Sequence, residues 1–350
     1  MNILHVTNKL NHADGVSAHL YNLANELNRN YNVKAGIICS GGDAVKKFTD
    51  AGIEVTENKN LNHSTRSMKN FASAVIFLYK TSKSNKINIL HSHNHYAANI
   101  SFKSSKFSGV RTIQTIHGII PDCGRLSHHS GENFVAVNDH VFRSLKSKLK
   151  NINRIELIYN GLDFNEDIRK KKNKKLKFIA ASRFEPGKGL NTFINAVGGL
   201  PEDYRSRADF IIAGEGSLEA ELKKLSKKIN ADIIFPGMIR NLKELFMETD
   251  VFVIPSENEG FPITMLEAAA TLNSVISSDF DGVESILTDN EDGLIFRKND
   301  ADELSRKIMH LIDNPESAVK YSAAFFKKAK AVFSLSEMGR KHFNFYKSLI

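Results

Sequence analysis

Short apolar, β-rich runs alternate with helix-compatible segments along the whole chain, and this alternation most constrains the fold. In the first half, the strand-like runs are residues 3–6, 33–38, 53–55, 87–91, 112–116, 134–137 and 155–158. Helical segments between them include 16–27, 68–80 and 139–150. Strands that alternate with helices pair in parallel, so the pattern predicts a doubly wound α/β sheet.

The second half repeats the rhythm. Its strand-like runs are 177–181, 210–213, 232–235, 251–254, 274–277 and 294–296, and its helical segments are 190–197, 217–229, 242–249, 263–272, 302–313, 315–332 and 337–349. With 350 residues the chain has room for about two domains. We expect a first domain over 1–165, a basic linker over 166–177, a second domain over 178–333 and a final helix over 334–350.

With 41% hydrophobic and 25% charged residues, the composition is typical of an ordinary soluble globular protein. We see no apolar stretch long enough to span a bilayer and no signal peptide at the N-terminus. The two cysteines, Cys39 and Cys123, stand outside any Cys-x-x-Cys pattern. This usage favours a reducing cytoplasm.

The positive charge is concentrated in the first half. Residues 1–177 hold 27 Lys and Arg against 13 Asp and Glu, whereas residues 178–350 hold 21 against 26. A basic half can face nucleic acid, an anionic membrane or an anionic substrate, and the lysine run within 169–177 can equally be a solvated linker. That run has no interleaved aromatic residues and no recognition motif, which argues against nucleic acid.

The segment 182–190 follows a strand and opens a helix. Such a turn presents free backbone N–H groups at the positive end of the helix dipole, which suits a phosphate. Gly187 and Gly189 allow close approach, Arg183 offers a planar fork, and Lys188 a point charge for a diphosphate. The alternative is a surface turn with two exposed cations.

The segment 255–268 also follows a strand, and Pro262 suits the first turn of the next helix. We expect Glu259 in the loop and Glu267 about a turn and a half inside the helix. Ionised carboxylates accept hydrogen bonds, so each can hold the diol of a sugar or ribose. The alternative is that these carboxylates only favour a helix N-terminus and a solvated surface.

Histidines follow two strands of the first half. His117 comes directly after the run 112–116, at the sheet edge where such folds place ligands, although a lone histidine can equally be structural. His91, His93 and His95 alternate after another strand and invite a metal interpretation. No third ligand at fixed spacing supports a metal there, and His91 can equally pack under the sheet.

Two further segments have weak patterns. The loop 8–17 lies where dinucleotide folds carry their glycines, but it holds a single glycine, Gly15, and matches neither a Gly-x-Gly-x-x-Gly fingerprint nor a Walker loop. Asp279 and Asp281 form an Asp-x-Asp pattern that holds a metal in some nucleotide-sugar enzymes. Its position after a late strand favours an ordinary loop.

As a set, these motifs resemble glycosyltransferase family 4, whose members have the GT-B fold. The most similar segment is 259–268, with Glu259 and Glu267 as its Glu-x7-Glu pair. Smaller similarities, in family order, are Val135-Ala136-Val137-Asn138, Tyr159-Asn160-Gly161-Leu162-Asp163, Ser182-Arg183-Phe184 with Lys188-Gly189, Gly214-Glu215-Gly216 and Phe235-x-Gly237. The resemblance covers nearly the whole chain. It implies two Rossmann-like domains facing across a cleft, with the last helix returning to the first domain.

The resemblance also implies site roles. Arg183 and Lys188 would neutralise the departing diphosphate, Glu267 would hold the ribose, Glu259 the transferred sugar, and His117 would lie near that sugar. The implied donor-binding set is Gly15, Val16, Arg183, Lys188, Phe235, Met238, Ile239, Glu259, Gly260, Phe261, Pro262, Ile263, Thr264 and Glu267. Pro262 replaces a glycine of many relatives and has no N–H to donate. The loop at Gly15 has one glycine where the family often has two.

The implied reaction moves a hexose or N-acetylhexosamine from a nucleotide-diphosphate sugar, UDP-linked by family frequency, to a saccharide or lipid-linked acceptor of bacterial capsule, O-antigen or lipopolysaccharide, with retention. The resemblance implies no metal or other cofactor. The basic first half would attract an anionic acceptor or the inner membrane face, which would make the protein peripheral on that membrane. Two alternatives stay open: a nucleotide-sugar epimerase of the same fold and a non-catalytic sugar-nucleotide-binding module.

Overall fold

The computed structural model covers residues 1–350 and describes all of them except 13, 119–131, 150–151, 169, 171–172 and 240. The chain divides into two units, the first comprising Met1–Gly161 with Leu335–Ile350 and the second Leu162–Ser334. The final helix therefore belongs to the first unit. Cys123, Arg169, Lys171 and Lys172 lie outside the described residues.

The boundary between the units falls four residues before the one drawn from the sequence, and the basic stretch 166–177 belongs to the second unit. Lys170 Nζ donates to the Leu272 carbonyl at 2.9 Å, and burial lowers the pKa of this lysine to about 8. Asn173 Nδ2 donates to Asp250 Oδ2 at 2.9 Å. Lys170 and Asn173 are thus anchored to the second unit, whereas Lys174 and Lys175 are exposed.

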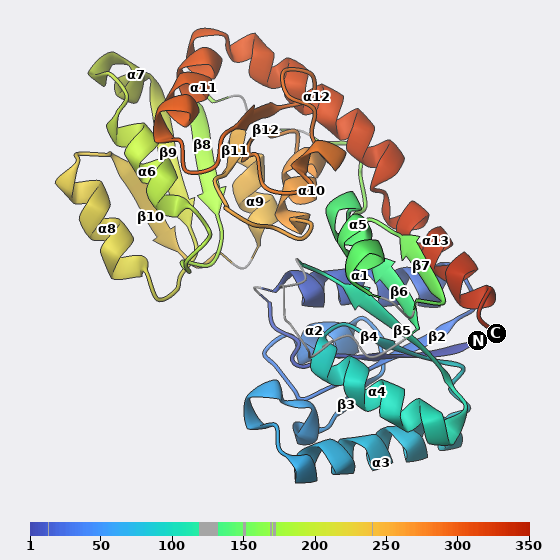
Figure 1. Ribbon diagram of the computed structural model, residues 1–350. Helices are drawn as coiled ribbons and strands as arrows, with labels where there is room; N and C mark the ends of the chain where they lie inside the picture. The colour runs from blue at the N-terminus through green and yellow to red at the C-terminus, as the bar shows by residue number, and fades with distance from the viewer. Residues whose placement is uncertain (13, 119–131, 150–151, 169, 171–172, 240) are drawn as a thin grey trace. The chain divides into compact units, whose positions relative to one another are not determined.

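The described residues of the first unit form a seven-stranded parallel sheet in the order β3-β2-β1-β4-β5-β6-β7 (Figure 1). Its strands are β1 (Asn2–Val6), β2 (Lys34–Cys39), β3 (Val55–Glu57), β4 (Ile89–Ser92), β5 (Arg111–Ile116), β6 (Asn133–Ala136) and β7 (Arg154–Leu157). In the register of β1 and β4, His5 lies beside His91. The strand expected at 53–55 begins two residues later, and Ile53 packs in the core before it.

Helices cover both faces of this sheet. They are α1 (Gly15–Asn30), α2 (Val45–Asp50), α3 (Met68–Ser84), α4 (His95–Ser108), α5 (Asp139–Lys148) and α13 (Leu335–Lys347), with 3-10 turns at Lys59–Leu61 and His63–Thr65. Because side chains alternate along a strand, Ile3 packs in the core under α1 and α13 while Leu4 packs in the core under α3 and α4. Gly339 lets α13 approach α1 closely, since a Cβ there would lie 2.4 Å from Glu26 Cγ.

The described residues of the second unit form a six-stranded parallel sheet in the order β10-β9-β8-β11-β12-β13. The strands are β8 (Leu176–Ala181), β9 (Ala208–Ala213), β10 (Ile233–Gly237), β11 (Val251–Ile254), β12 (Ser274–Ser278) and β13 (Leu294–Phe296). The central strand β11 is apolar throughout and fully buried, as expected for a parallel sheet covered on both faces.

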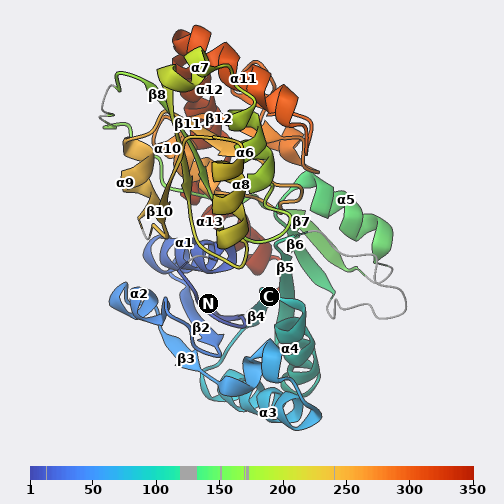
Figure 2. The same ribbon diagram turned by 90° about the vertical axis from the view of Figure 1, so that its left-hand side faces the viewer.

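The helices of the second unit are α6 (Leu190–Gly198), α7 (Glu202–Arg207), α8 (Glu219–Lys228), α9 (Leu242–Met247), α10 (Ile263–Ala270), α11 (Ala301–Asp313) and α12 (Pro315–Val332), with a 3-10 turn at Val283–Ser285. Figures 1 and 2 show α6 beside α8, and these helices cover a core that includes Phe178, Phe193 and Phe210. Helix α10 ends two residues before the expected end, because Leu272 takes the left-handed conformation with φ 55°.

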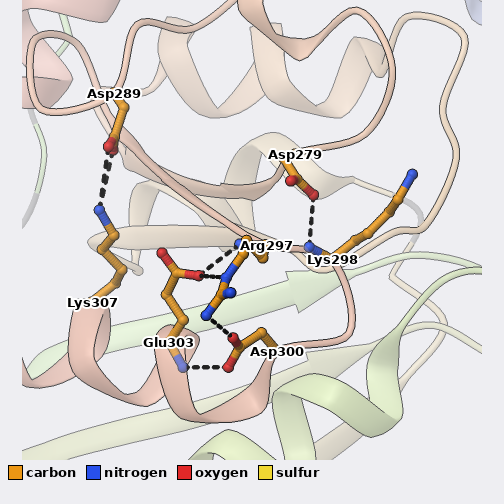
Figure 3. A network of polar contacts seen from close by, with 7 residues as sticks. All are labelled: Asp279, Asp289, Arg297, Lys298, Asp300, Glu303 and Lys307. Atoms are coloured by element: carbon orange, nitrogen blue, oxygen red, sulfur yellow. Dashed lines mark hydrogen bonds and ion pairs between the residues drawn. The ribbon is translucent and has the colours of Figure 1, made fainter.

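Asp279 lies directly after β12, where its side chain binds the backbone after β13 (Figure 3). Its Oδ1 accepts a hydrogen bond from the Lys298 backbone N–H at 2.7 Å. Next to it, Arg297 pairs with Asp300 and Glu303 at 2.8 and 3.0 Å, and Lys307 pairs with Asp289 at 3.3 Å. Asp279 therefore stabilises the turn around β13, and Phe280 beside it is fully buried.

Among the described residues, no helix combines the length and the apolar character that crossing a bilayer requires.

Candidate functional site

The turn between β8 and α6 carries both cations that the sequence singled out. Near its end, Lys188 has 22% of its side chain exposed, and its Nζ lies 2.7 Å from Glu259 Oε1. Near its start, Arg183 is 56% exposed and pairs with Glu185 at 2.8 Å. The two cations thus differ: Lys188 is half-buried against a loop carboxylate, whereas Arg183 lies on the surface.

This turn packs directly on the loop that follows β11. The Glu257 N–H donates to the Gly187 carbonyl at 2.9 Å. Gly189 has φ 63°, and a Cβ at this position would lie 1.8 Å from the Pro255 carbonyl oxygen. Only glycine fits a left-handed backbone position in such close contact with another strand end.

We expect Gly189→Ala to lower both the stability of the second unit and its affinity for the ligand, because the new methyl group pushes apart the loops that follow β8 and β11. The free energy of unfolding should fall by about 3 kcal/mol or more, since strain and steric overlap add. Gly187→Ala is the matched control: φ is 82° but nothing lies within 4 Å of its Cβ, so only the left-handed backbone cost of about 1–2 kcal/mol applies. Urea unfolding followed by circular dichroism measures both, and equal losses would contradict this packing.

Two further loops join the same edge of the sheet. The Gly214 N–H donates to the Gly237 carbonyl at 2.9 Å, which connects the ends of β9 and β10. Gly216 lies against the backbone of Phe184, and the ring of Phe184 meets that of Phe235 edge-on at 6.5 Å. The carboxyl ends of four neighbouring strands, β10, β9, β8 and β11, therefore form one surface, the usual ligand side of such sheets.

Helix α10 places the second carboxylate. It begins at Ile263, as expected from the sequence, and Pro262 is its N-cap residue rather than part of its first turn. Glu267 is the fifth residue of the helix, about one turn inside, and its side chain is half-buried. Pro262 provides no side-chain cap, and the Met265 N–H donates to the Pro262 carbonyl at 2.9 Å, so the N–H groups that can face an anion are those of Ile263 and Thr264.

The remaining predicted donor-binding residues of this unit differ in how far they are exposed. Phe261 and Ile263 are buried, and Phe261 packs edge-on against Phe333 at 5.4 Å, so these two can offer a ligand only backbone groups. Met238 is 41% exposed, and Phe235 and Ile239 are half-buried beside it. Gly260 and Thr264 are half-buried in the loop and the first helical turn, and Pro262 is buried.

Three predicted site residues belong to the first unit: Gly15, Val16 and His117. Gly15 and Val16 open helix α1, where Gly15 is exposed and Val16 is half-buried. The Asp14 carboxylate already caps this helix, accepting from the Ser17 N–H at 3.1 Å. An anion at this N-terminus would therefore meet a carboxylate as well as backbone N–H groups.

His117 is part of a group of six histidines, here called the histidine cluster. Its members are His5 on β1, His19 on α1, His91 on β4, His93 and His117 just after β4 and β5, and His342 on α13. His93 forms the centre: its Nε2 lies 3.0 Å from His5 Nδ1, and its Nδ1 lies 3.0 Å from His117 Nε2. Both ring nitrogens of His91 are also engaged, by Tyr346 Oη and Thr115 Oγ1, each at 2.7 Å.

Burial keeps the histidine cluster uncharged at neutral pH. It lowers the pKa of His5 and of His342 to about 3 and that of His19 to about 4. The pKa of His91, His93 and His117 is also lowered, first by burial and then by repulsion from the neighbouring histidines. A neutral His117 can donate or accept a hydrogen bond, as recognition of a sugar hydroxyl requires.

His5, His19 and His342 were not predicted from the sequence as partners of His117. A signal was present: β1, β4 and β5 are neighbours in the sheet, and each has a histidine at or just beyond its carboxyl end. Ile3 and His5 lie two residues apart on β1, so their side chains point to the same face of the sheet, the face that α1 and α13 cover. The contributions of His19 and His342 could not be read from the sequence, because they depend on how those helices pack.

Two doubly wound parallel sheets, the second with cations and carboxylates along its ligand edge, define the class of this protein as a GT-B glycosyltransferase. The chain belongs to glycosyltransferase family 4. The model described as Glycosyltransferase Family 4 matches residues 13–166, and that described as Glycosyl transferases group 1 matches residues 163–329. The family and the fold class predicted from the motifs are thereby confirmed.

Curated relatives include the UDP-Gal:alpha-D-GlcNAc-diphosphoundecaprenol alpha-1,3-galactosyltransferase of Escherichia coli. This chain is similar to it with 23% identity over 320 residues, which is 83% of this chain and 82% of that protein. A GalNAc-alpha-(1->4)-GalNAc-alpha-(1->3)-diNAcBac-PP-undecaprenol alpha-1,4-N-acetyl-D-galactosaminyltransferase of Campylobacter jejuni is 27% identical over 169 residues, 47% of each chain. The matched part of this chain spans about half the length of several such relatives, 52% in an uncharacterized glycosyltransferase of Methanocaldococcus jannaschii.

Among solved structures, Anabaena Alr3699/HepE in complex with UDP has the same fold. The TM-score is 0.85, with 15% sequence identity over 99% of this chain and 100% of that chain.

Proposed function

We propose that this protein transfers a hexose or N-acetylhexosamine from a UDP-sugar to a hydroxyl group of a lipid-linked or free saccharide in bacterial surface-polysaccharide synthesis. The half-buried Lys188–Glu259 pair on the ligand edge of the second sheet is the observation that carries the proposal. A cation placed there can meet a phosphate, and a carboxylate there can meet sugar hydroxyls.

In this proposal the second unit binds the donor. Lys188 and Arg183 stabilise the negative charge that develops as the diphosphate leaves, and the N–H groups of Ile263 and Thr264 at the start of α10 add to this. Glu267 accepts from the ribose hydroxyls and Glu259 from the transferred sugar. Lys188 then exchanges part of its contact with Glu259 for the phosphate. The sugar is transferred with retention, and the departing phosphate helps to take the acceptor proton, without a metal ion.

The first unit supplies the acceptor side of the reaction. Neutral His117 contacts the transferred sugar, while Gly15 and Val16 approach the diphosphate. The excess of basic residues in the first half favours an anionic acceptor, and the relatives named above carry a diphosphoundecaprenol acceptor in their names. We therefore infer that the protein acts at the cytoplasmic face of a bacterial membrane, with a lipid-linked diphosphate sugar as its acceptor.

The donor assignment is tested by thermal unfolding with UDP-, GDP- and ADP-sugars. A ligand at about a hundred times its dissociation constant should add about 2.7 kcal/mol to the free energy of unfolding. We expect this gain with a UDP-sugar alone and its loss in Glu267→Ala, because the ribose contact disappears. Glu316→Ala, in the first turn of α12, removes a carboxylate far along the chain from these motifs and should keep the gain. A folded protein stabilised by none of these nucleotide sugars would overturn the proposal.

A further inference from the structure

Three members of the histidine cluster present ring nitrogens to one point. One nitrogen each of His19, His93 and His117 lies within 4.8 Å of the other two. Three imidazoles on a tetrahedral Zn²⁺ have Zn–N distances of about 2.0–2.1 Å, so their nitrogens are about 3.3 Å apart. Small side-chain movements would bring the three nitrogens to this separation.

The hydrogen bond of His19 determines which nitrogen is available. Its Nδ1 lies 2.7 Å from Asn160 Oδ1, and an amide oxygen only accepts, so Nδ1 carries the proton. The other nitrogen, Nε2, therefore has a lone pair, and it is buried with no hydrogen-bond partner among the described residues. A buried acceptor without a donor is costly unless something else binds it.

His93 has a comparable arrangement. When Nδ1 of His93 binds a metal ion, its proton lies on Nε2, which then donates to His5 Nδ1 at 3.0 Å. Histidines that bind metals usually donate their second N–H to another acceptor, which orients the ring. Asn160 and His5 provide such acceptors for His19 and His93, respectively.

The neighbouring trio of His5, His91 and His93 is less suitable. Its nitrogens are also within 4.8 Å of one another. However, His91 bonds Tyr346 and Thr115 through its two nitrogens, so a metal would remove a bond between the ring and a hydroxyl group. In the first trio, a metal replaces the hydrogen bond between His93 Nδ1 and His117 Nε2, and both of these nitrogens become ligands. His117 is moreover half-buried, whereas His5, His91 and His93 are buried, so the first trio is the more exposed of the two.

We propose that His19, His93 and His117 bind one divalent transition-metal ion of the Zn²⁺ type. Neutral imidazoles prefer Zn²⁺, Co²⁺, Ni²⁺ and Cu²⁺ over Mg²⁺ or Ca²⁺, which prefer oxygen ligands. The site lies in the first unit alone, and it shares His117 with the proposed contact to the transferred sugar. The sequence offered a metal at His91, His93 and His95 without a further ligand at fixed spacing, and at Asp279 and Asp281. The fold instead brings His93 together with His19 of α1 and His117 after β5.

Cobalt titration tests the site directly. The full chain, produced without a histidine tag and freed of metal by a chelator, should bind one Co²⁺ and develop the intense visible absorption of tetrahedral cobalt. His117→Gln and His19→Gln should each weaken binding at least tenfold. Asn160→Ala should weaken it by about 10–100-fold, although Asn160 is not a ligand. His310→Gln, an exposed histidine on α11, is the matched control and should bind like the unaltered chain.

X-ray absorption of the zinc-loaded, unaltered chain keeps the test independent of variant folding. We expect a first shell with about three imidazole nitrogens. Mg²⁺ at the same concentration should not displace cobalt. The proposal is overturned if the folded chain binds no Co²⁺, if both histidine variants bind it as tightly as the unaltered chain, or if the zinc shell consists of oxygen. Each of these results would make the histidine cluster a packed, metal-free polar core.

Discussion

Acidification from pH 7.5 to about pH 5 is expected to unfold the first unit of the chelator-treated protein before the second. In the unfolded chain each histidine takes up a proton as the pH falls through about 6.5. In the folded chain the histidine cluster resists protonation, since the pKa of His5 and His342 is about 3 and that of His19 about 4. The stability linked to these depressed values is therefore fully present above pH 6.5 and is lost as the pH falls below it.

The expected size of this effect is that of a whole domain's stability. At pH 5.5, each histidine that stays neutral only when folded lowers the free energy of unfolding by about 1 kcal/mol, so the histidine cluster together lowers it by several kcal/mol. Domains are stable by about 5–15 kcal/mol in total. The pKa of Tyr346, which touches His91, is raised by burial, so this tyrosine stays neutral throughout and adds nothing.

Hydrogen exchange of peptides from each unit between pH 7.5 and pH 5, corrected for the intrinsic exchange rate, measures this loss. The chain has no tryptophan, so far-UV circular dichroism provides the second signal. His342→Gln should flatten the pH dependence by about one proton, whereas the exposed His310→Gln should leave it unchanged. Undiminished protection of the first unit at pH 5 would refute the neutral, buried state of the cluster.

The Lys188→Ala variant is expected to release UDP from its UDP-sugar about 10²–10³-fold more slowly, the usual loss when one preorganised charge-stabilising group is removed. Lys188 is held at 2.7 Å from Glu259 with little solvent around it, so its charge is weakly screened at the position proposed for the diphosphate. The effect should fall mainly on kcat, because the charge on the leaving group grows in the transition state.

Lys328→Ala is the matched control for Lys188→Ala. Lys328 also pairs with a carboxylate at 2.7 Å, that of Asp292, and has 29% of its side chain exposed against 22% for Lys188. Removing it breaks an equivalent ion pair in the same unit, so stability falls while kcat per folded molecule stays the same. A Lys188→Ala variant that keeps more than about a third of the original kcat, less than 1 kcal/mol of transition-state stabilisation, would contradict the proposed role.

The positions of several helices and strands could be predicted from the local sequence. Val251–Ile254, Leu294–Phe296 and Pro315–Val332 have the ends read from the sequence, because apolar runs and a proline at a helix start act over a few residues. The loops with Arg183, Lys188 and Glu259 could also be predicted, since each directly follows a strand and carboxyl ends of parallel strands share one edge.

Contacts between distant residues required the tertiary structure. The pairing of Lys188 with Glu259 spans 71 residues, and it arises because β8 and β11 are neighbours in the sheet although other strands separate them in the chain. Likewise, no spacing in the sequence relates Lys170 to the Leu272 carbonyl that holds it. A hydrophobic period sets the inward face of a strand, but it does not specify which strand lies beside it.

The sequence by itself determined the family, the two parallel sheets and the polar loops at their ligand edges, because these follow from short-range periodicity and local motifs. Only the tertiary structure decided that the six histidines of the histidine cluster come together, five of them buried and His117 half-buried. Those residues come from both ends and the middle of the first unit. Their neutral state and their capacity for a metal depend on burial and on ring-to-ring distances, which arise only when α1 and α13 pack over β1, β4 and β5.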